Sequence, residues 1–299
     1  MTDSKQSLGD AEVMMMTASG RTLRVARWKA QSQKRGKTSV PPLLFFNGVG
    51  ANIELVAPFA RSVGERDFII FDMPGVGESP DPLIPYNPIT MSQTASQIMS
   101  DLGYDSMDVM GVSWGGAMAQ HFAMQYPARV ERLILAATTA GWMMMPGKLS
   151  ALSKMANPRR YIDPDFMAKN FATLYGGKTD GADGHVGRVR PPSGVGYFYQ
   201  LLAMVGWTSA PLLPFLLKAE TLVIMGEDDN IVPVSNGRFL ASLIPGAELH
   251  IVKDGGHLFL VSQAEESLAI VNAFLSRPRK TARAAAQGGE ARGAKRKAA

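Results

Sequence analysis

Residues 107–125, MDVMGVSWGGAMAQHFAMQ, contain the feature on which the fold prediction depends. An apolar run at 107–110 leads into Gly111-x-Ser113-x-Gly115, and a helix-compatible segment follows. A serine on a sharp strand-to-helix turn needs glycine two residues to either side, because larger side chains would collide there. The pattern therefore predicts a strand, a tight turn and a helix, with the Ser113 hydroxyl exposed as a candidate nucleophile.

Further apolar runs surround this stretch and alternate with amphipathic segments. The runs are at 43–46, 68–71, 133–137, 221–225 and 249–252, and the amphipathic segments are at 52–63, 91–102, 117–125 and 264–275. Continuous apolar strands separated by helices indicate an α/β fold with a mostly parallel sheet covered by helices on both faces. A further strand at 22–28 is expected to pair antiparallel at one edge.

The alternation stops after residue 137 and resumes only near 221, which divides the chain. We expect a core formed by residues 13–137 and 219–276 and a helical cap formed by residues 138–218. Such a cap would cover the carboxyl edge of the sheet, where α/β proteins bind their ligands. Residues 1–12 and the basic segment 277–299 are expected to be disordered.

The composition favours a globular protein without disulfides. Of the 299 residues, 46% are hydrophobic and 19% are charged, which predicts a well-buried core. Cysteine is absent, so disulfides and thiolate chemistry are excluded. We find no secretory signal and no segment long enough to span a membrane, and therefore expect a cytoplasmic protein. The segment 277–299 carries eight Lys or Arg and one Glu, so the excess positive charge lies there.

A nucleophilic serine needs a base, and only four histidines are present. His250 lies within a predicted strand, His121 within a predicted helix and His185 in a polar loop of the cap. His257 alone follows a strand end, in the flexible turn Asp254-Gly255-Gly256-His257. We therefore predict His257 as the base.

The base must be oriented by a carboxylate, and the loop after the strand at 221–225 contains Glu227, Asp228 and Asp229. Periodicity does not distinguish between these adjacent residues. Asp229 is the preferred acid, since Asp228 more often caps a turn. The chain order Ser, Asp, His is that of the α/β-hydrolases.

Acyl transfer also requires hydrogen-bond donors for the developing oxyanion. The backbone amide of Trp114 is one candidate, and the glycine-rich loop after the strand at 43–46 supplies Val49 as the second. Asn47 stands where many hydrolases have histidine. The same loop, together with Asp72, partly matches a dinucleotide-binding pattern, although the third glycine is missing. No zinc-binding motif is present, and the chemistry requires neither a metal nor another cofactor.

The chain resembles the α/β-hydrolase superfamily over residues 42–276, and within it the intracellular poly(3-hydroxyalkanoate) depolymerases that act on medium-chain-length polyesters. The motifs that carry the resemblance are FNGVGANIELV (46–56), FDMPGVGES (71–79), GVSWGGAMAQ (111–120), PRRY (158–161), LYGG (174–177), GWTS (206–209), GEDDNIVP (226–233) and GGHLFL (255–260). By this resemblance Ser113, Asp229 and His257 match the nucleophile, acid and base.

The resemblance, rather than any spacing of residues, implies a polyester substrate and a location at intracellular polyester granules. Asn47, Trp142, Met143 and Phe259 are the candidate substrate-binding residues, although apolar cap residues more often form the core of the cap itself. The loop 178–194 and the basic segment 277–299 depart from the family pattern. That basic segment is either a solvated extension or a contact for nucleic acid or a granule-coat protein.

Three other functions remain open from sequence. A small-molecule carboxylesterase or lactonase, or a carbon–carbon bond hydrolase, would use the same three residues. A non-catalytic protein that binds granules or nucleic acid would rely on the basic segment alone. The sequence does not indicate an oligomeric state.

Overall fold

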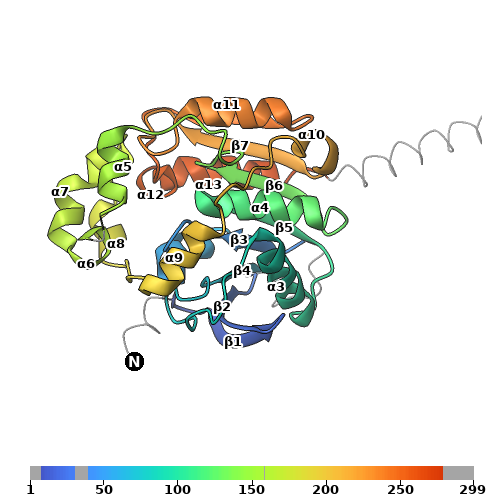
Figure 1. The fold of residues 1–299 in the computed structure, drawn as a ribbon. Coiled ribbons are helices and arrows are strands. Elements are labelled where there is room, and N and C mark those ends of the chain that lie inside the picture. Colours follow the sequence, from blue (N-terminus) through green and yellow to red (C-terminus); the bar gives the residue numbers. More distant parts are fainter. Residues whose placement is uncertain (1–7, 31–39, 158, 279–299) are drawn as a thin grey trace, which may run out of the picture.

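The computed structural model describes residues 8–30, 40–157 and 159–278. Its centre is an eight-stranded sheet with the strand order β1-β2-β4-β3-β5-β6-β7-β8 (Figure 1). The strands are β1 (Glu12–Ala18), β2 (Arg21–Trp28), β3 (Leu43–Phe46), β4 (Phe68–Phe71), β5 (Met107–Val112), β6 (Val130–Ala136), β7 (Glu220–Gly226) and β8 (Glu248–Val252). The mostly parallel sheet predicted from the apolar runs is confirmed.

The six strands from β3 to β8 are parallel, and β1 and β2 are antiparallel to their neighbours. All residues of β3 and β4 are buried, as continuous apolar runs predict for strands covered on both faces. The edge differs from the prediction, because β1 and not β2 is the outermost strand. The two form a hairpin in which Ser19 and Gly20 both have positive φ, a conformation that favours tight two-residue turns.

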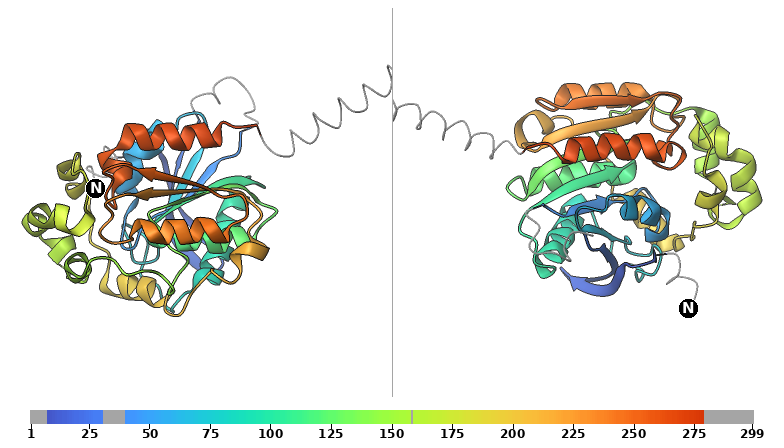
Figure 2. Two further views of the ribbon diagram at one scale, coloured as in Figure 1. Left: turned by 90° about the horizontal axis from the view of Figure 1, so that it is seen from above. Right: turned by 180° about the vertical axis from the view of Figure 1, so that it is seen from behind.

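Helices cover both faces of the sheet (Figure 2). One face packs against α3 (Pro88–Asp101), α4 (Trp114–Gln125) and α11 (Val234–Leu243), and the other against α2 (Ile53–Ser62), α12 (Phe259–Ser262) and α13 (Ala264–Leu275). Successive side chains of a strand point to opposite faces of the sheet. In β3, Leu44 and Phe46 pack on the face covered by α3, α4 and α11, and Leu43 and Phe45 pack on the other face.

The described residues between β6 and β7 form six helices. The helices α5 (Leu149–Met155), α6 (Arg159–Ile162), α7 (Pro164–Tyr175) and α8 (Ala182–Val186) cluster at one side of the molecule (Figure 1). Helix α9 (Gly194–Leu202) lies over the loops that follow β3 and β4, where the Gln200 side chain accepts a hydrogen bond from the Gly50 amide. Helix α10 (Leu213–Leu216) leads back to β7.

At each end of the folded core, a residue that was expected to be disordered makes defined contacts. Leu8 is buried, and its carbonyl accepts a 3.1 Å hydrogen bond from the Trp28 indole, although residues 1–12 were expected to be disordered. Arg277, expected in the disordered tail, forms a bidentate ion pair with Glu248. The rest of that tail, residues 279–299, lies outside the described residues. In the described part of the chain, no helix has both the length and the apolar character needed to cross a lipid bilayer.

Candidate active site

Ser113 occupies a sharp turn between β5 and α4. Its backbone has φ 54° and ψ −123°, a region that non-glycine residues enter only at a cost in free energy. A Cβ atom at Gly111 would clash with the carbonyl oxygen of Gly115, and one at Gly115 with the carbonyl oxygen of Phe46. The strand, turn and helix predicted from residues 107–125 are therefore all present, and the glycines permit the close packing of the turn.

His257 and Asp229 form a buried pair at the carboxyl ends of β8 and β7. The His257 Nδ1 atom lies 2.7 Å from Asp229 Oδ2. The other oxygen, Oδ1, accepts hydrogen bonds of 2.8 Å from the backbone amides of Ile231 and Val232. These amides hold the carboxylate in place against Nδ1, the arrangement in which a catalytic triad leaves the Nε2 atom of its histidine for proton transfer.

The neighbouring acidic residues have other contacts. A Glu227 side-chain oxygen accepts a 3.3 Å hydrogen bond from the Asp254 amide, and the Asp228 amide donates a 2.8 Å hydrogen bond to the Gly255 carbonyl. Both contacts tie together the loops after β7 and β8. Of the three acidic residues that the sequence left open, Asp229 is the one that the structure places against His257.

Asn47 organises the loop after β3. Its side-chain oxygen accepts a hydrogen bond from the Gly48 amide, and its Nδ2 atom donates to the carbonyls of Ala51 and Asn52. Val49 from this loop lines the same cavity as Ser113. The Trp114 indole donates a 3.0 Å hydrogen bond to the Gln200 carbonyl, which ties the start of α4 to α9. The oxyanion-binding roles of the Val49 and Trp114 amides stay a prediction.

The partial dinucleotide-binding pattern has a structural explanation. Asp72 is buried, lies 3.2 Å from the Arg24 guanidinium, and accepts a 2.8 Å hydrogen bond from the Ile53 amide at the start of α2. A carboxylate enclosed in this way cannot reach the ribose of a dinucleotide. Asp72 therefore joins the N-terminal hairpin to α2.

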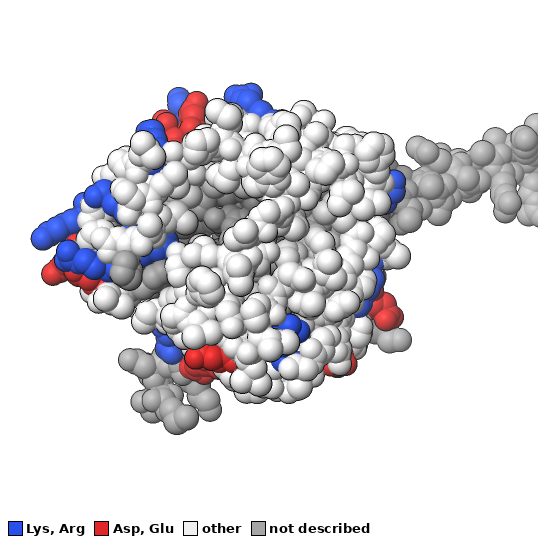
Figure 3. All heavy atoms as spheres, in the orientation of Figure 1, with Lys and Arg blue, Asp and Glu red and all other residues white. Residues whose placement is uncertain are grey.

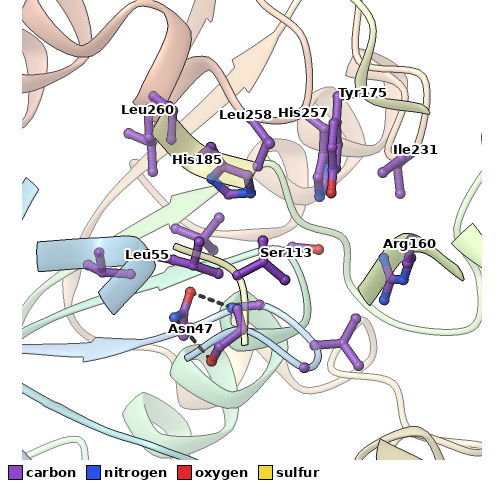
Figure 4. Close-up of a pocket in the computed structure, with 18 of the residues that line it drawn as sticks. Asn47, Leu55, Ser113, Arg160, Tyr175, His185, Ile231, His257, Leu258 and Leu260 are labelled. Carbon is purple, nitrogen blue, oxygen red and sulfur yellow. Dashed lines mark hydrogen bonds between the residues drawn. The ribbon is translucent and has the colours of Figure 1, made fainter. Parts of the chain in front are cut away.

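A cavity lies between Ser113, His257 and the helices that connect β6 to β7. Ser113 and His257 lie on its wall together with residues from the loop after β3 and from helices α5 to α8 (Figure 4). The lining is mainly apolar and includes Leu55, Phe59, Met155, Met167, Leu258 and Val261. Such a space suits an alkyl chain held next to a few polar groups.

Tyr175 is a cavity residue that the sequence reasoning did not select. Its ring stacks on the His257 imidazole with an interplanar angle of 7° and a centroid separation of 6.4 Å. Its carbonyl accepts a 2.7 Å hydrogen bond from the His257 amide. Burial raises the pKa of the Tyr175 hydroxyl, so this side chain stays neutral. The LYGG motif at 174–177 was the signal that could have identified it.

Two further polar residues, from helices between β6 and β7, also face the cavity. His185, which the sequence placed in a polar loop away from the chemistry, lies on α8 and lines the cavity. Arg160, from the PRRY motif, lines it as well and donates a 3.1 Å hydrogen bond to the Tyr197 hydroxyl. Sequence position alone did not reveal either location, because both depend on how the cap helices pack.

Of the four candidate substrate-binding residues, the structure places only Asn47 on the cavity wall. Trp142 and Met143 are exposed on the surface, since the segment after β6 turns them outward. Phe259 is fully buried in the core between the sheet and α13. These three residues therefore do not line this cavity, whereas the residues beside Phe259, Leu258 and Leu260, do. A substrate-binding role for Trp142 and Met143 stays a prediction.

Within residues 8–30, 40–157 and 159–278, no cluster of three or more His, Asp or Glu side chains is arranged to hold a metal ion.

Comparison with known proteins supports the architecture. Residues 41–175 and 187–264 match the alpha/beta hydrolase fold family. The chain is 44% identical over 252 residues to a poly(3-hydroxyalkanoate) depolymerase from Ectopseudomonas oleovorans, covering 83% of this chain and 88% of that protein. It is 28% identical over 256 residues to a 2-hydroxymuconate semialdehyde hydrolase from Pseudomonas sp. (strain CF600), covering 79% of this chain and 87% of that protein.

Solved structures show the same fold at lower identity. An esterase from Exiguobacterium antarcticum superposes with a TM-score of 0.73 at 17% identity, covering 88% of this chain and 98% of that one. The enol-lactonase from Burkholderia xenovorans LB400 has a TM-score of 0.71 at 20% identity and covers 88% of this chain and all of that one. The family match and the strand-to-helix turn at Ser113 show that the chain belongs to the α/β-hydrolase fold family, as a homologue of poly(3-hydroxyalkanoate) depolymerase.

Proposed function

We propose that this protein is a serine hydrolase that cleaves the ester bonds of poly(3-hydroxyalkanoate), with medium-length side chains, and releases 3-hydroxyalkanoic acids or their oligomers. The observation that carries the proposal is the buried His257–Asp229 pair, in which His257 lines the same apolar cavity as Ser113. The 44% identity to a poly(3-hydroxyalkanoate) depolymerase supports the choice of substrate. The cavity supports it too, because its apolar lining matches alkyl side chains.

In the proposed mechanism, His257 takes the hydroxyl proton of Ser113 as the serine oxygen attacks the ester carbonyl. The backbone amides of Val49 and Trp114 hold the oxyanion of the tetrahedral intermediate. The intermediate collapses, and His257 donates the proton to the departing alkoxide of the shortened polymer. A water molecule then loses a proton to His257 and attacks the acyl-enzyme, which frees the carboxylate and restores the Ser113 hydroxyl.

Two kinds of purified granule test this proposal, one of polyester with short side chains and one with medium-length side chains. We expect soluble 3-hydroxyalkanoic acids or oligomers from the medium-length material, measured by mass spectrometry of the supernatant. Hydrolysis of short soluble esters without release from either granule would point instead to a small-molecule carboxylesterase or lactonase. The spectrum of oligomer lengths also separates cleavage at chain ends from cleavage within chains.

A carbon–carbon bond hydrolase is the second candidate, because the chain is also 28% identical to a 2-hydroxymuconate semialdehyde hydrolase. Cleavage of a vinylogous diketone in the absence of any ester hydrolysis would favour this function. A non-catalytic granule-binding or nucleic-acid-binding function would depend on the basic tail, whose residues 279–299 lie outside the described residues.

The surface near the cap has the character expected of a protein that contacts an uncharged polymer. In Figure 3 one face is almost free of Lys, Arg, Asp and Glu, which lie at its periphery, and the face is hollowed near its centre. Exposed apolar residues between β6 and β7 include Trp142, Met145, Leu149, Phe198, Val205 and Phe215. Exposed apolar side chains that lie together mark a contact surface, so the aromatic residues among these are the ones to test.

We expect the double substitution Trp142→Ser and Phe198→Ser to lower the rate on granules by about tenfold, since each aromatic ring loses apolar area that the polymer would bury. The two side chains are 68% and 59% exposed, so the fold does not depend on them. Hydrolysis of soluble p-nitrophenyl octanoate should stay within about twofold. Met15→Ser, on the edge strand β1 and 52% exposed, is the control and should leave both rates unchanged. Equal losses on granule and soluble ester would contradict the contact role.

A further inference from the structure

His185 is a buried polar group that the proposed mechanism does not use. It lies on α8, is only 7% exposed, and lines the cavity that contains Ser113 and His257. Figure 4 shows its imidazole directed into the cavity, on the wall across from Ser113. It therefore faces the space that the acyl part of an ester would occupy.

The surroundings of His185 keep it neutral. The rings of Phe171 and Tyr175 lie 6.2 Å and 6.3 Å from the imidazole centroid, each in an edge-on arrangement. Burial, with a smaller contribution from the Arg188 charge, lowers the pKa of His185 to about 4. A neutral imidazole has one N–H donor and one acceptor nitrogen, so it can exchange a hydrogen bond with an uncharged ligand.

The hydrogen-bonding capacity of this imidazole is incompletely used. Nδ1 is buried and has no hydrogen-bond partner among the described residues. A buried N–H without an acceptor is rarer in proteins than an unsatisfied acceptor, which assigns the proton to Nε2 and leaves Nδ1 as a bare lone pair. The other polar residues of the cap wall already have contacts: Arg160 donates to Tyr197, and the Tyr175 ring is stacked on His257.

We propose that His185 is a positioning residue that donates a hydrogen bond from Nε2 to the oxygen on C3 of the acyl unit, and so favours 3-oxygenated acyl esters over plain acyl esters. This inference rests on the proposed function, because a poly(3-hydroxyalkanoate) carries an oxygen at C3 of every unit. In this arrangement the apolar lining contacts the alkyl side chain, and His185 supplies the hydrogen bond that an ester without an oxygen on C3 cannot accept. A site built to hydrogen-bond an oxygen discriminates against ligands that lack one.

The test compares p-nitrophenyl 3-hydroxyoctanoate with p-nitrophenyl octanoate. We expect the unmodified protein to prefer the hydroxylated ester by about tenfold in kcat/KM, the usual scale of one hydrogen bond to a buried neutral group. His185→Leu should remove this preference by raising KM for the hydroxylated ester alone. His185→Gln, which keeps an N–H donor, should restore part of it. No preference in the unmodified protein, or equal losses on both esters in His185→Leu, would overturn the proposal.

Thermal unfolding separates positioning from a structural role. Leucine fills the apolar site beside Phe171 and removes the unsatisfied Nδ1, so His185→Leu should unfold at the same or a higher temperature. A large loss of stability would show that His185 serves the fold.

Binding makes the test independent of catalysis. In the Ser113→Ala background, the methyl ester of 3-hydroxyoctanoic acid should bind about tenfold more tightly than methyl octanoate, and adding His185→Leu should abolish the difference. If the unmodified protein releases no 3-hydroxyalkanoic acids or oligomers from granules and hydrolyses neither p-nitrophenyl ester, the proposed function fails, while this binding difference still decides the role of His185. Equal affinities for the two methyl esters would refute that role.

Discussion

Ser113→Ala is expected to lower turnover of polyester and of soluble esters by about four to six orders of magnitude, because the attacking oxygen is lost while the rest of the site stays in place. The substitution removes one atom from a residue at a strained turn, and the surrounding glycines already accommodate the backbone. The fold should therefore persist. The measurement is the initial rate of p-nitrophenyl octanoate hydrolysis, together with release of 3-hydroxyalkanoic acids from granules.

Two comparisons make this result decisive. Ser153→Ala alters an exposed serine of cap helix α5 and should leave the rate unchanged. A fluorophosphonate probe should label the unmodified protein and the Ser153→Ala variant, and fail to label Ser113→Ala. Near-normal hydrolysis by purified Ser113→Ala would refute the assignment of the nucleophile.

Asp229→Asn is expected to lower kcat by about four orders of magnitude, the effect known for the equivalent change in a serine protease triad. The asparagine oxygen can still accept the hydrogen bonds from the Ile231 and Val232 amides, so its amide nitrogen would face His257 Nδ1. That nitrogen donates, which favours the imidazole tautomer with the proton on Nε2. An Nε2 atom that already carries a proton cannot accept one from Ser113.

Asp228→Asn is the matched control, because it makes the same chemical change one residue away at a side chain that the structure does not place against His257. Its kcat should stay within about threefold of the unmodified protein. Thermal unfolding of both variants shows whether the loop after β7 keeps its structure. If Asp229→Asn retains more than about a tenth of the activity, or if Asp228→Asn loses as much, a different carboxylate orients the histidine.

Local pattern was sufficient to predict the sheet and the turn. Six apolar runs from LLFF at 43–46 onward became the six parallel strands, since a strand covered on both faces needs continuous apolar residues. The glycines at 111 and 115 predicted the turn at Ser113 for a steric reason that involves nearby backbone. The one missed strand, β1, alternates between exposed and half-buried residues at a sheet edge, where the apolar signal is weakest.

The cap was harder to interpret, because the orientation of a short helix depends on its partners. Trp142, Met143 and Phe259 share the apolar character expected of substrate contacts, yet the first two are exposed and the third lies in the core. His185 and Tyr175 reach the cavity because α7 and α8 pack together above it. The local sequence of neither helix predicts which side chains face the cavity.

The sequence by itself determined the alternation of strands and helices, the turn that exposes Ser113, and the location of the base and acid in loops after two later strands. These features follow from backbone sterics and from the burial of neighbouring residues, which act over a few positions. The sequence favoured Asp229 as the acid, but only the tertiary structure placed its carboxylate against His257 and His185 on the cavity wall. Both outcomes depend on packing between segments far apart in the chain, and the hydrophobic periodicity of either segment does not predict such contacts.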